Sequence, residues 1–201
     1  MTTATNRLTG FSTIRQTAMN LSNHFLIAMP SMHDPIFGGS VVYLCEHNER
    51  GALGVVINKP MDITIDHLLE RLNMKLEIHA PISKPVMFGG PVQEDRGFVL
   101  HSPDTEFTSM LRISDQVAFT TSRDVLEAIA SGTGPERMLV SIGYAGWSAG
   151  QLESEISHNG WLTAPADPAI IFDLPIHERY AAAIRLLGFD PSRLASGVGH
   201  A

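Results

Sequence analysis

The feature that most constrains this chain is a series of short β-branched and aromatic runs joined by brief polar turns. Two of these runs, residues 41–45 and 52–57, are separated only by the turn 46–51. Parallel strands need a connection of roughly a dozen residues or more, so this pair predicts an antiparallel hairpin. Further short strands are predicted at residues 24–29, 86–88, 97–101, 108–113, 117–120, 137–143, 161–162 and 169–172.

Apolar residues at helical spacing separate some of these strands. Helices are predicted from a cap at Asp62 or Thr64 to Leu72, and over residues 123–130, 149–157 and 176–187. Two strand–helix–strand stretches therefore leave room for parallel pairing, whereas most neighbouring strands must be antiparallel. The sequence predicts an α+β fold in which a mixed, mostly antiparallel sheet curls toward a barrel and the helices pack outside it.

Length and composition favour one globular domain. The chain has 201 residues, of which 44% are hydrophobic and 17% charged, and no repeat divides it. We expect a single domain over residues 21–201, ending in an irregular glycine-rich segment at 196–201, after a disordered N-terminal tail over residues 1–20. The tail is rich in threonine and poor in acidic residues, a composition that is also typical of a transit peptide.

The charge balance and the single cysteine argue against several classes of protein. Lys and Arg total 14 against 21 Asp and Glu, giving a net charge of −7, so the basic surface needed for sequence-independent nucleic-acid binding is missing. Cys45 has no partner for an internal disulfide, which fits a reducing compartment. No apolar run suits a signal peptide or a membrane span. We expect a cytoplasmic protein that binds neither nucleic acid nor membrane directly.

Residues 146–150 read Gly-Trp-Ser-Ala-Gly, the G-x-S-x-G pattern of a nucleophile elbow, between a predicted strand and a predicted helix. In that interpretation Ser148 attacks an acyl carbon, and an acid and a histidine follow it in chain order. The candidates for those two roles are Asp167, Asp173, His177 and His200. Little chain remains to present them, and such a short motif often arises by chance at a strand-to-helix turn. Ser148 is a remote hydrolase candidate, and no catalytic residue is assigned.

Cys45 and His47 lie two positions apart on a predicted strand, so their side chains are expected on the same face. Such a pair could form a thiolate nucleophile or hold a metal. The other histidines are scattered without zinc-site spacing, and an isolated cysteine usually packs in a core. We expect a buried, slowly reacting Cys45 and neither a metal nor another cofactor.

Two loops that leave strand ends carry groups suited to an anion. Asn58 and Lys59 follow one predicted strand, and Gly89 and Gly90 follow another. A lysine beside an amide and a glycine backbone could hold a phosphate or carboxylate, although ordinary tight turns use the same residues. No dinucleotide or Walker motif accompanies them, so no nucleotide is predicted.

The predicted helix 149–157 has a narrow apolar seam. Leu152 and Ile156 form this seam at a spacing of four residues, so Glu153 and Glu155 are expected to face water. The helix is therefore acidic, which is the wrong charge for a DNA-recognition helix.

Both tryptophans of the chain, Trp147 and Trp161, flank this helix. Burial against the sheet would require acceptors for the indole N–H groups, which loop carbonyls near Gly143 or Asn159 could provide. Tryptophan is also enriched in protein interfaces. The alternative to core packing is therefore a partner-binding face made of Trp147, Gln151, Glu155 and Trp161.

Several blocks carry a resemblance to a known family, and they lie at residues 21–30 (LSNHFLIAMP), 40–47 (SVVYLCEH), 51–60 (GALGVVINKP), 88–92 (FGGPV), 97–101 (GFVLH), 143–147 (GYAGW), 150–155 (GQLESE), 159–166 (NGWLTAPA) and 199–201 (GHA). Together they resemble the YqgE/AlgH family of bacterial proteins. The resemblance implies one α+β domain with a bifurcated sheet folded into a pseudo-barrel, and it brings no catalytic residues. One branch of the family carries the description of a transcriptional regulator of alginate synthesis.

Two functions remain open. The first is a non-catalytic regulatory or interaction protein that acts on gene expression through an unknown protein partner, as a monomer or weak homodimer. The second is a small anionic-ligand-binding domain or minor enzyme that uses Asn58, Lys59, Gly89 and Gly90. A concave pocket shared by the two loops would favour the second function, whereas a flat polar and aromatic patch would favour the first.

Overall fold

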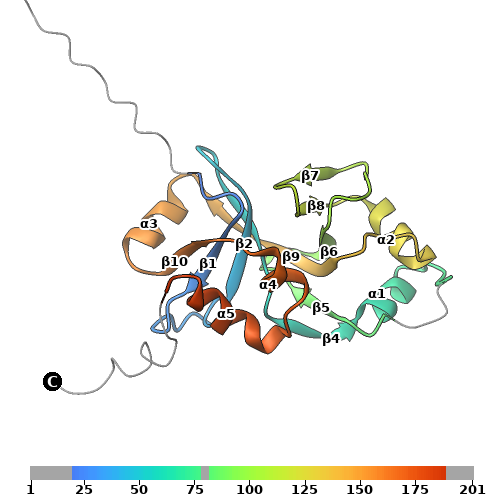
Figure 1. The fold of residues 1–201 in the computed structure, drawn as a ribbon, viewed down its shortest axis with the longest axis horizontal. Helices are drawn as coiled ribbons and strands as arrows, with labels where there is room; N and C mark the ends of the chain where they lie inside the picture. Colours follow the sequence, from blue (N-terminus) through green and yellow to red (C-terminus); the bar gives the residue numbers. More distant parts are fainter. Residues whose placement is uncertain (1–19, 78–81, 189–201) are drawn as a thin grey trace, which may run out of the picture.

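The computed structural model describes residues 20–77 and 82–188, and it confirms an α+β fold built on a curled, mostly antiparallel sheet (Figure 1). The strands within these residues are β1 (His24–Ala28), β2 (Val41–Asn48), β3 (Gly51–Val56), β4 (Pro60–Thr64), β5 (Pro85–Phe88), β6 (Val92–His101), β7 (Met110–Arg112), β8 (Ala118–Thr120), β9 (Met138–Ser148) and β10 (Trp161–Pro165). The helices are α1 (Ile65–Arg71), α2 (Arg123–Ser131), α3 (Gln151–Ser157), α4 (Pro168–Phe172) and α5 (Arg179–Arg185), with a 3₁₀ turn, η1 (Ile176–Glu178), before α5.

One sheet joins the strands in the order β10-β1-β2-β3-β9-β6-β8-β7, with β5 also beside β9 and β4 beside β5. All of these pairings are antiparallel except that of β5 with β9, where Met87 faces Ser141 in a parallel register. The mixed, mostly antiparallel sheet is therefore confirmed.

The long strand β9 is where the sheet divides. Its final residues pair with β3, from Ala145 to Ser148, whereas its earlier residues pair with β5 and β6. Gly143 lies between the two regions with φ +72°, and a Cβ added there would stand 2.2 Å from the Gly90 carbonyl oxygen. Because only glycine tolerates that approach, Gly143 lets β9 serve both branches of the bifurcated sheet.

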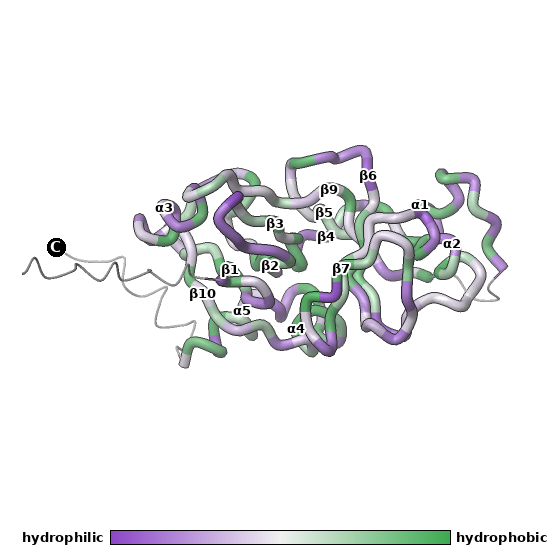
Figure 2. Tube along the Cα trace, turned by 90° about the horizontal axis from the view of Figure 1, so that it is seen from above, coloured by the Kyte–Doolittle hydropathy of each residue, from purple (hydrophilic) through white to green (hydrophobic). Residues whose placement is uncertain are grey.

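The helices pack outside the sheet, as the sequence predicts, and they cover it in three places. α4 and α5 pack on the buried cluster that contains Tyr43 and Phe98, and α3 packs on the cluster that contains Leu26. α1 and α2 cover a third cluster around Val99 and Val140. Seen from above, α3 lies at one end of the molecule and α2 at the other (Figure 2).

The β2–β3 hairpin forms as predicted, and it contains a bulge that the sequence did not reveal. The register shifts between Leu44 and Glu46, so Cys45 is the extra residue. Beyond the bulge His47 pairs with Ala52, which belongs to the cluster beneath α3, whereas Cys45 packs in the cluster beneath α5. Cross-strand partners share a face. Cys45 and His47 therefore lie on opposite faces, and the expectation of a shared face is wrong.

The strand predicted at residues 169–172 is also wrong, because this segment is helix α4. The Asp167 side chain accepts a hydrogen bond from the Ala169 backbone N–H at 2.9 Å, and Pro168 occupies the first turn. An aspartate cap followed by proline is a strong helix start. These local signals outweigh the β-branched character of Ile170 and Ile171.

Other differences concern boundaries. β4 is an additional short strand, so Asp62 lies within it and Thr64 is the N-cap of α1. β9 extends beyond the predicted end at residue 143, through Ser148. The helix predicted at 176–187 is divided into η1 and the shorter α5, and it is followed by Gly188 in a left-handed conformation.

Some predictions lie outside the described residues, namely the tail over residues 1–19, the segment 196–201 and the candidate His200. In the part of the chain that the structure describes, none of the helices combines the length and apolar character that a membrane crossing requires.

Candidate functional site

Helix α3 begins where the chain turns back at the end of β9. Gly150 occupies the N-cap with φ +75°, a left-handed conformation that costs glycine little. The Gln151 side chain accepts a hydrogen bond from the Ser148 backbone N–H at 3.0 Å, which ties the helix to the strand. Leu152 is fully buried beneath the helix. These contacts fix which side chains α3 presents to its neighbours.

Three aromatic rings lie next to α3: Trp147 from β9, Trp161 from β10, and Phe37 from the loop between β1 and β2. The two indole rings meet edge to face with centroids 6.0 Å apart, and the Phe37 ring lies 6.2 Å from Trp147 and 5.6 Å from Trp161. Trp147 is 6% exposed and Trp161 is 4% exposed. The prediction that both tryptophans pack against the sheet is confirmed.

A single carboxylate, that of Glu155, accepts both indole N–H groups. Its Oε2 receives Nε1 of Trp147 at 2.9 Å and Nε1 of Trp161 at 2.8 Å, and its Oε1 receives Nε2 of Gln151 at 3.0 Å. The acceptors are therefore not the loop carbonyls near Gly143 or Asn159. The helical spacing predicted that Glu155 faces water. Instead, its carboxylate is the acceptor that the two buried indole N–H groups require.

A pocket of about 520 Å³ opens beside these rings. We call it the aromatic–acidic pocket, and it is lined by Met32, Asp34, Phe37, Pro91, Gly146, Trp147, Gln151, Glu155, His158, Gly160 and Trp161. Its volume lies within the range of roughly 300–1,000 Å³ that is usual for ligand sites.

The charge on this lining is negative. Asp34 accepts the backbone N–H groups of Ile36 and Phe37, both at 2.8 Å, and the lining includes neither lysine nor arginine. Within the described residues, neither Asp34 nor Glu155 forms an ion pair. Every hydrogen bond to the Glu155 carboxylate comes from a neutral donor, so its negative charge is not balanced by a neighbouring cation.

His47 holds α3 through a second glutamate. The His47 Nδ1 accepts a hydrogen bond from the Leu21 backbone N–H at 3.1 Å, so the proton of a neutral imidazole lies on Nε2. Nε2 then donates to Oε1 of Glu153 at 3.0 Å. His47 is 3% exposed, whereas the Glu153 side chain remains 43% exposed. Glu153 is thus tethered at one oxygen and faces water only in part.

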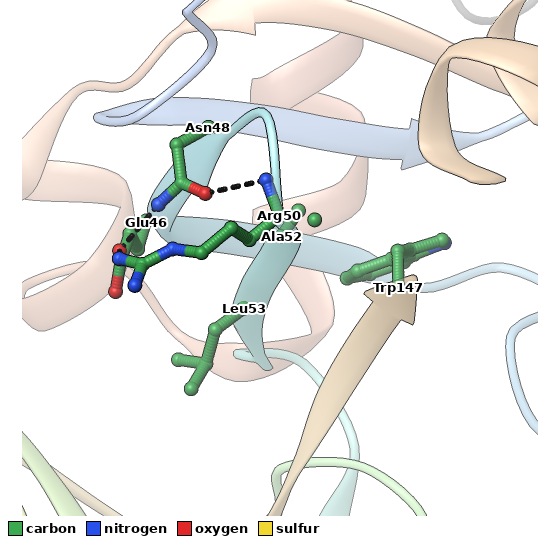
Figure 3. A pocket seen from close by; sticks show the side chains of 7 residues that line it. Glu46, Asn48, Arg50, Ala52, Leu53 and Trp147 are labelled. Atoms are coloured by element: carbon green, nitrogen blue, oxygen red, sulfur yellow. Dashed lines mark hydrogen bonds and ion pairs between the residues drawn. The ribbon is translucent and has the colours of Figure 1, made fainter. Parts of the chain in front are cut away.

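A second hollow, of about 270 Å³, lies at the tip of the β2–β3 hairpin (Figure 3). There Asn48 donates to Glu46 Oε1 at 2.5 Å and accepts the Arg50 backbone N–H at 2.8 Å. Figure 3 shows Trp147 set apart from these polar groups, on the neighbouring strand. The polar side chains of this hollow bond to one another, and the Arg50 side chain is 89% exposed. The aromatic–acidic pocket is therefore the stronger candidate site.

The residues predicted to hold an anion use their polar groups within the chain. Asn58 accepts the Val41 backbone N–H at 2.8 Å and donates to the Gly39 carbonyl at 2.9 Å. Lys59 donates to the Ile36 carbonyl, and partial burial lowers the pKa of its ammonium group. All three contacts join the β3–β4 connection to the segment that leads into β2, so they hold that segment in place.

Gly89 and Gly90 lie where their backbone passes very close to the backbone of β9. A Cβ on Gly89 would lie 2.2 Å from the Gly143 carbonyl oxygen, and one on Gly90 would lie 2.3 Å from that of Tyr144. The Gly89 N–H donates to the Ile142 carbonyl at 2.9 Å. The structure does bring the two loops together, because the Phe88 N–H donates to the Lys59 carbonyl at 2.8 Å.

In the part of the chain that the structure describes, the hydrolase candidate Ser148 forms no hydrogen bond with a histidine or an acidic side chain. The three candidate partners within the described residues are engaged elsewhere: Asp167 caps α4, Asp173 pairs with Arg137, and Nε2 of His177 lies 3.7 Å from Oε1 of Glu178. The fourth candidate, His200, lies outside the described residues. Ser148 is exposed and donates its backbone N–H to Gln151.

Cys45 is 3% exposed, which confirms the predicted burial. Burial raises the pKa of its thiol well above the usual value, with a smaller contribution from Glu46. Among the described residues, no group of three or more His, Cys, Asp or Glu side chains is placed to hold a metal ion.

Among the carboxylates and aromatic rings that line the pocket, sequence reasoning missed two, Asp34 and Phe37. The pair Asp34-Pro35 signals a turn, but nothing local indicates that this turn covers two tryptophans more than a hundred positions away. The contact of His47 with Glu153 spans 106 positions and has no local signal either.

Comparison with known proteins agrees with this fold. The family model described as AlgH-like matches residues 25–192. A UPF0301 protein of Cupriavidus metallidurans is 61% identical over 183 residues, 91% of this chain and 96% of that protein. A UPF0301 protein of Chromobacterium violaceum is 58% identical over 184 residues, 92% of this chain and 99% of that protein.

Two solved structures are similar. The solution structure of the AlgH protein from Pseudomonas aeruginosa has a TM-score of 0.76 at 52% identity, covering 93% of this chain and 99% of that one. Protein DIP2367 from Corynebacterium diphtheriae has a TM-score of 0.66 at 19% identity, covering 82% of this chain and 86% of that one, and it shows the fold alone. With a family model and relatives that span nearly its whole described length, the chain belongs to the AlgH-like family of UPF0301 proteins.

Proposed function

We propose that this chain is a non-catalytic interaction protein that binds a positively charged segment of a protein partner in the aromatic–acidic pocket. The observation that carries the proposal is the carboxylate of Glu155, which is held by two indoles and an amide and has no cationic partner among the described residues. A lysine or arginine side chain entering the pocket would supply the missing charge.

The neighbouring groups favour the same occupant. Aromatic faces attract cations, and Phe37, Trp147 and Trp161 all line the pocket. Asp34 adds a second carboxylate at the lining, and Met32 offers a flexible side chain that adapts to the shape of a partner. The net charge of −7 would also steer a basic segment toward the molecule.

In this proposal the protein acts in the cytoplasm, as a monomer or weak homodimer. Any effect on gene expression would pass through the protein partner, because α3 carries Glu153 and Glu155 where a DNA-binding helix needs basic residues.

A fluorescence titration with short peptides tests the proposal. The peptides share one sequence and differ only at a central position that carries arginine, lysine, glutamine or glutamate. Both tryptophans of the chain line the pocket, so their emission reports occupancy directly. We expect a saturable change with the arginine and lysine peptides that weakens as salt screens the charges, and none with the glutamine or glutamate peptides.

Asp34→Asn is the matched variant. Asparagine retains an oxygen that can accept the Ile36 and Phe37 N–H groups, so the loop should persist while one negative charge is removed. Affinity for the arginine peptide should fall several-fold. Glu127→Gln on α2, a helix that packs on a separate hydrophobic cluster, should leave the affinity for the arginine peptide unchanged. Equal responses to the arginine and glutamine peptides, or an Asp34→Asn variant that binds as wild type does, would refute the proposal.

A further inference from the structure

Arg179, the first residue of α5, is a buried cation. It is 7% exposed, although arginine is almost never buried without a partner. Its Nη1 donates to the Ile57 carbonyl at 2.5 Å, and its Nε donates to the Leu174 carbonyl at 3.2 Å. These two carbonyls fix the plane of the guanidinium group and leave its Nη2 without a hydrogen bond from the described residues.

No acidic side chain among the described residues balances this charge. Within the described residues Arg179 forms no ion pair with a carboxylate. Burial lowers its pKa to about 10, and no nearby carboxylate offsets that effect. The guanidinium therefore stays charged at neutral pH. Removing a charge from water without a counter-ion is costly. Nη2 is not among the fully buried side-chain atoms of the described residues that lack a hydrogen-bond partner, so it keeps contact with solvent and is open to an acceptor from outside the chain.

Arg179 borders a cavity of about 290 Å³. The cavity lies between the beginnings of β5 and β9 on one side and the segment from α4 to α5 on the other. Apolar side chains make up most of its wall, among them Met87, Leu139, Phe172 and Ile176.

The other charged residues at the cavity leave its balance positive. Asp173 is the one acidic residue in the lining, and it is already paired with Arg137, whose Nε lies 3.1 Å from its Oδ1. Lys84 also lines the cavity and is exposed. The cavity therefore combines a positively charged end with an apolar wall, in a protein whose net charge is −7.

We propose that this cavity binds a small carboxylate with an apolar body, its carboxylate on the guanidinium of Arg179 and its apolar part against Leu139, Phe172 and Ile176. A carboxylate accepts from a guanidinium in a planar, charge-assisted arrangement, which supplies both the charge and the acceptor that Nη2 lacks. Lys84 would attract the anion to the entrance.

This site is separate from the loops that the sequence suggested for an anion. Asn58, Lys59, Gly89 and Gly90 are absent from its lining. It is also separate from the aromatic–acidic pocket, with which it shares no lining residue. The two proposals can therefore fail independently.

Octanoate, 1-octanol and inorganic phosphate are the probes that distinguish the contributions of charge and apolar surface. In thermal unfolding at neutral pH, octanoate should raise the midpoint in a saturable manner, whereas octanol and phosphate should shift it little at the same concentrations. In nitrogen-15 NMR of the wild-type protein, the Arg179 Nε–H signal should move with octanoate at the same midpoint concentration.

Two variants complete the test. Arg179→Gln should abolish the octanoate response, and Ile176→Trp, which fills the cavity and leaves the guanidinium in place, should weaken it at least tenfold. Lys84→Gln, at an exposed position, should weaken it only a few-fold. An equal response to octanol would show an apolar cavity without charge recognition, and an equal response to phosphate would show a general anion site. Either result, or an unmoved Arg179 signal in the wild-type protein, would overturn the proposal.

Discussion

Trp147 and Trp161, fourteen positions apart on β9 and β10, donate their indole N–H groups to the same oxygen atom, Oε2 of Glu155. The two strands are not neighbours in the sheet, since β1, β2 and β3 lie between them. The shared acceptor on α3 therefore closes one end of the curled sheet, and it places a negative charge among three aromatic rings. The Glu155 carboxylate therefore holds this end of the fold together, and in the proposed function it is also the group that binds a cation.

Replacing Glu155 should destabilise the protein more than a change at a surface position. In Glu155→Ala two buried indole N–H groups lose their acceptor, and hydrogen bonds to a charged group contribute about 1.5–3 kcal/mol each. We expect the free energy of unfolding to fall by about 2–4 kcal/mol, since such losses are not additive. Urea denaturation followed by circular dichroism measures it.

The control for this variant is Glu127→Ala on α2. Among the described residues, the Glu127 side chain pairs only with Arg123, in an exposed i,i+4 ion pair at 3.0 Å. Such pairs contribute about 0.3–0.5 kcal/mol. If the two variants lose the same stability, the shared acceptor is not an anchor of the fold.

Trp147→Phe and Trp161→Phe separate the contribution of the ring from that of the N–H group. Phenylalanine keeps an aromatic body and removes the donor to Glu155, so each change should cost about 1–3 kcal/mol, less than the roughly 3–5 kcal/mol expected for alanine. In each variant the single remaining tryptophan should emit at short wavelength when native and at longer wavelength when unfolded, because both indoles are buried. A native emission already characteristic of water would contradict the packing.

Cys45 should react slowly with thiol reagents in the native protein. It is buried, and burial raises the pKa of its thiol, so very little thiolate is present at neutral pH and the sulfur is inaccessible. Alkylation by iodoacetamide should be at least a hundredfold slower than in urea, and its rate should rise with destabilising conditions. Rapid native labelling would place Cys45 at the surface.

His101 should make stability depend on pH below neutrality. Its Nδ1 donates to the Ser102 carbonyl and its Nε2 accepts from the Thr120 hydroxyl, each at 2.8 Å, and burial lowers its pKa. The unfolded chain, with an ordinary histidine pKa of about 6.5, therefore takes up a proton before the folded chain does. The stabilisation is complete above that pKa and is lost as the pH falls toward the lower, folded-state value.

Urea midpoints between pH 7.5 and 5 measure this effect. The aspartates with lowered pKa values, including Asp66 and Asp124, do not interfere, because they change the pH dependence of stability only near and below about pH 4. In His101→Gln the slope over that interval should be smaller than in the wild type, by at most about 1.4 kcal/mol per pH unit. An unchanged slope would show that His101 does not carry the dependence.

Local patterns in the sequence were enough for the main features of the fold. Runs of β-branched and aromatic residues joined by short turns predicted the β2–β3 hairpin and an antiparallel sheet, and Thr64, one of two candidate caps, marked the start of α1. The β-branched residues of α4 wrongly predicted a strand, because the helix-start signal of the Asp167 cap and Pro168 is stronger. The bulge at Cys45 was invisible because it arises from pairing with β3.

The site was predictable only in part. Trp147 and Trp161 stood out because they are the only two tryptophans and they flank one helix. Helical spacing assigned Glu155 to water, since periodicity describes the face toward the sheet and says nothing of the indoles at its edge. Arg179 gave no signal, because an arginine at a helix start is usually a surface residue, and only the tertiary fold buries it.

Recognition of a cation by the pocket around Glu155 can be measured by NMR of the two indole N–H groups. Both indole signals should shift together in a saturable titration with the arginine-containing peptide, and neither should shift with the glutamate-containing peptide. Indole signals that stay unmoved at saturating arginine peptide, or that move equally with the glutamate peptide, would contradict it.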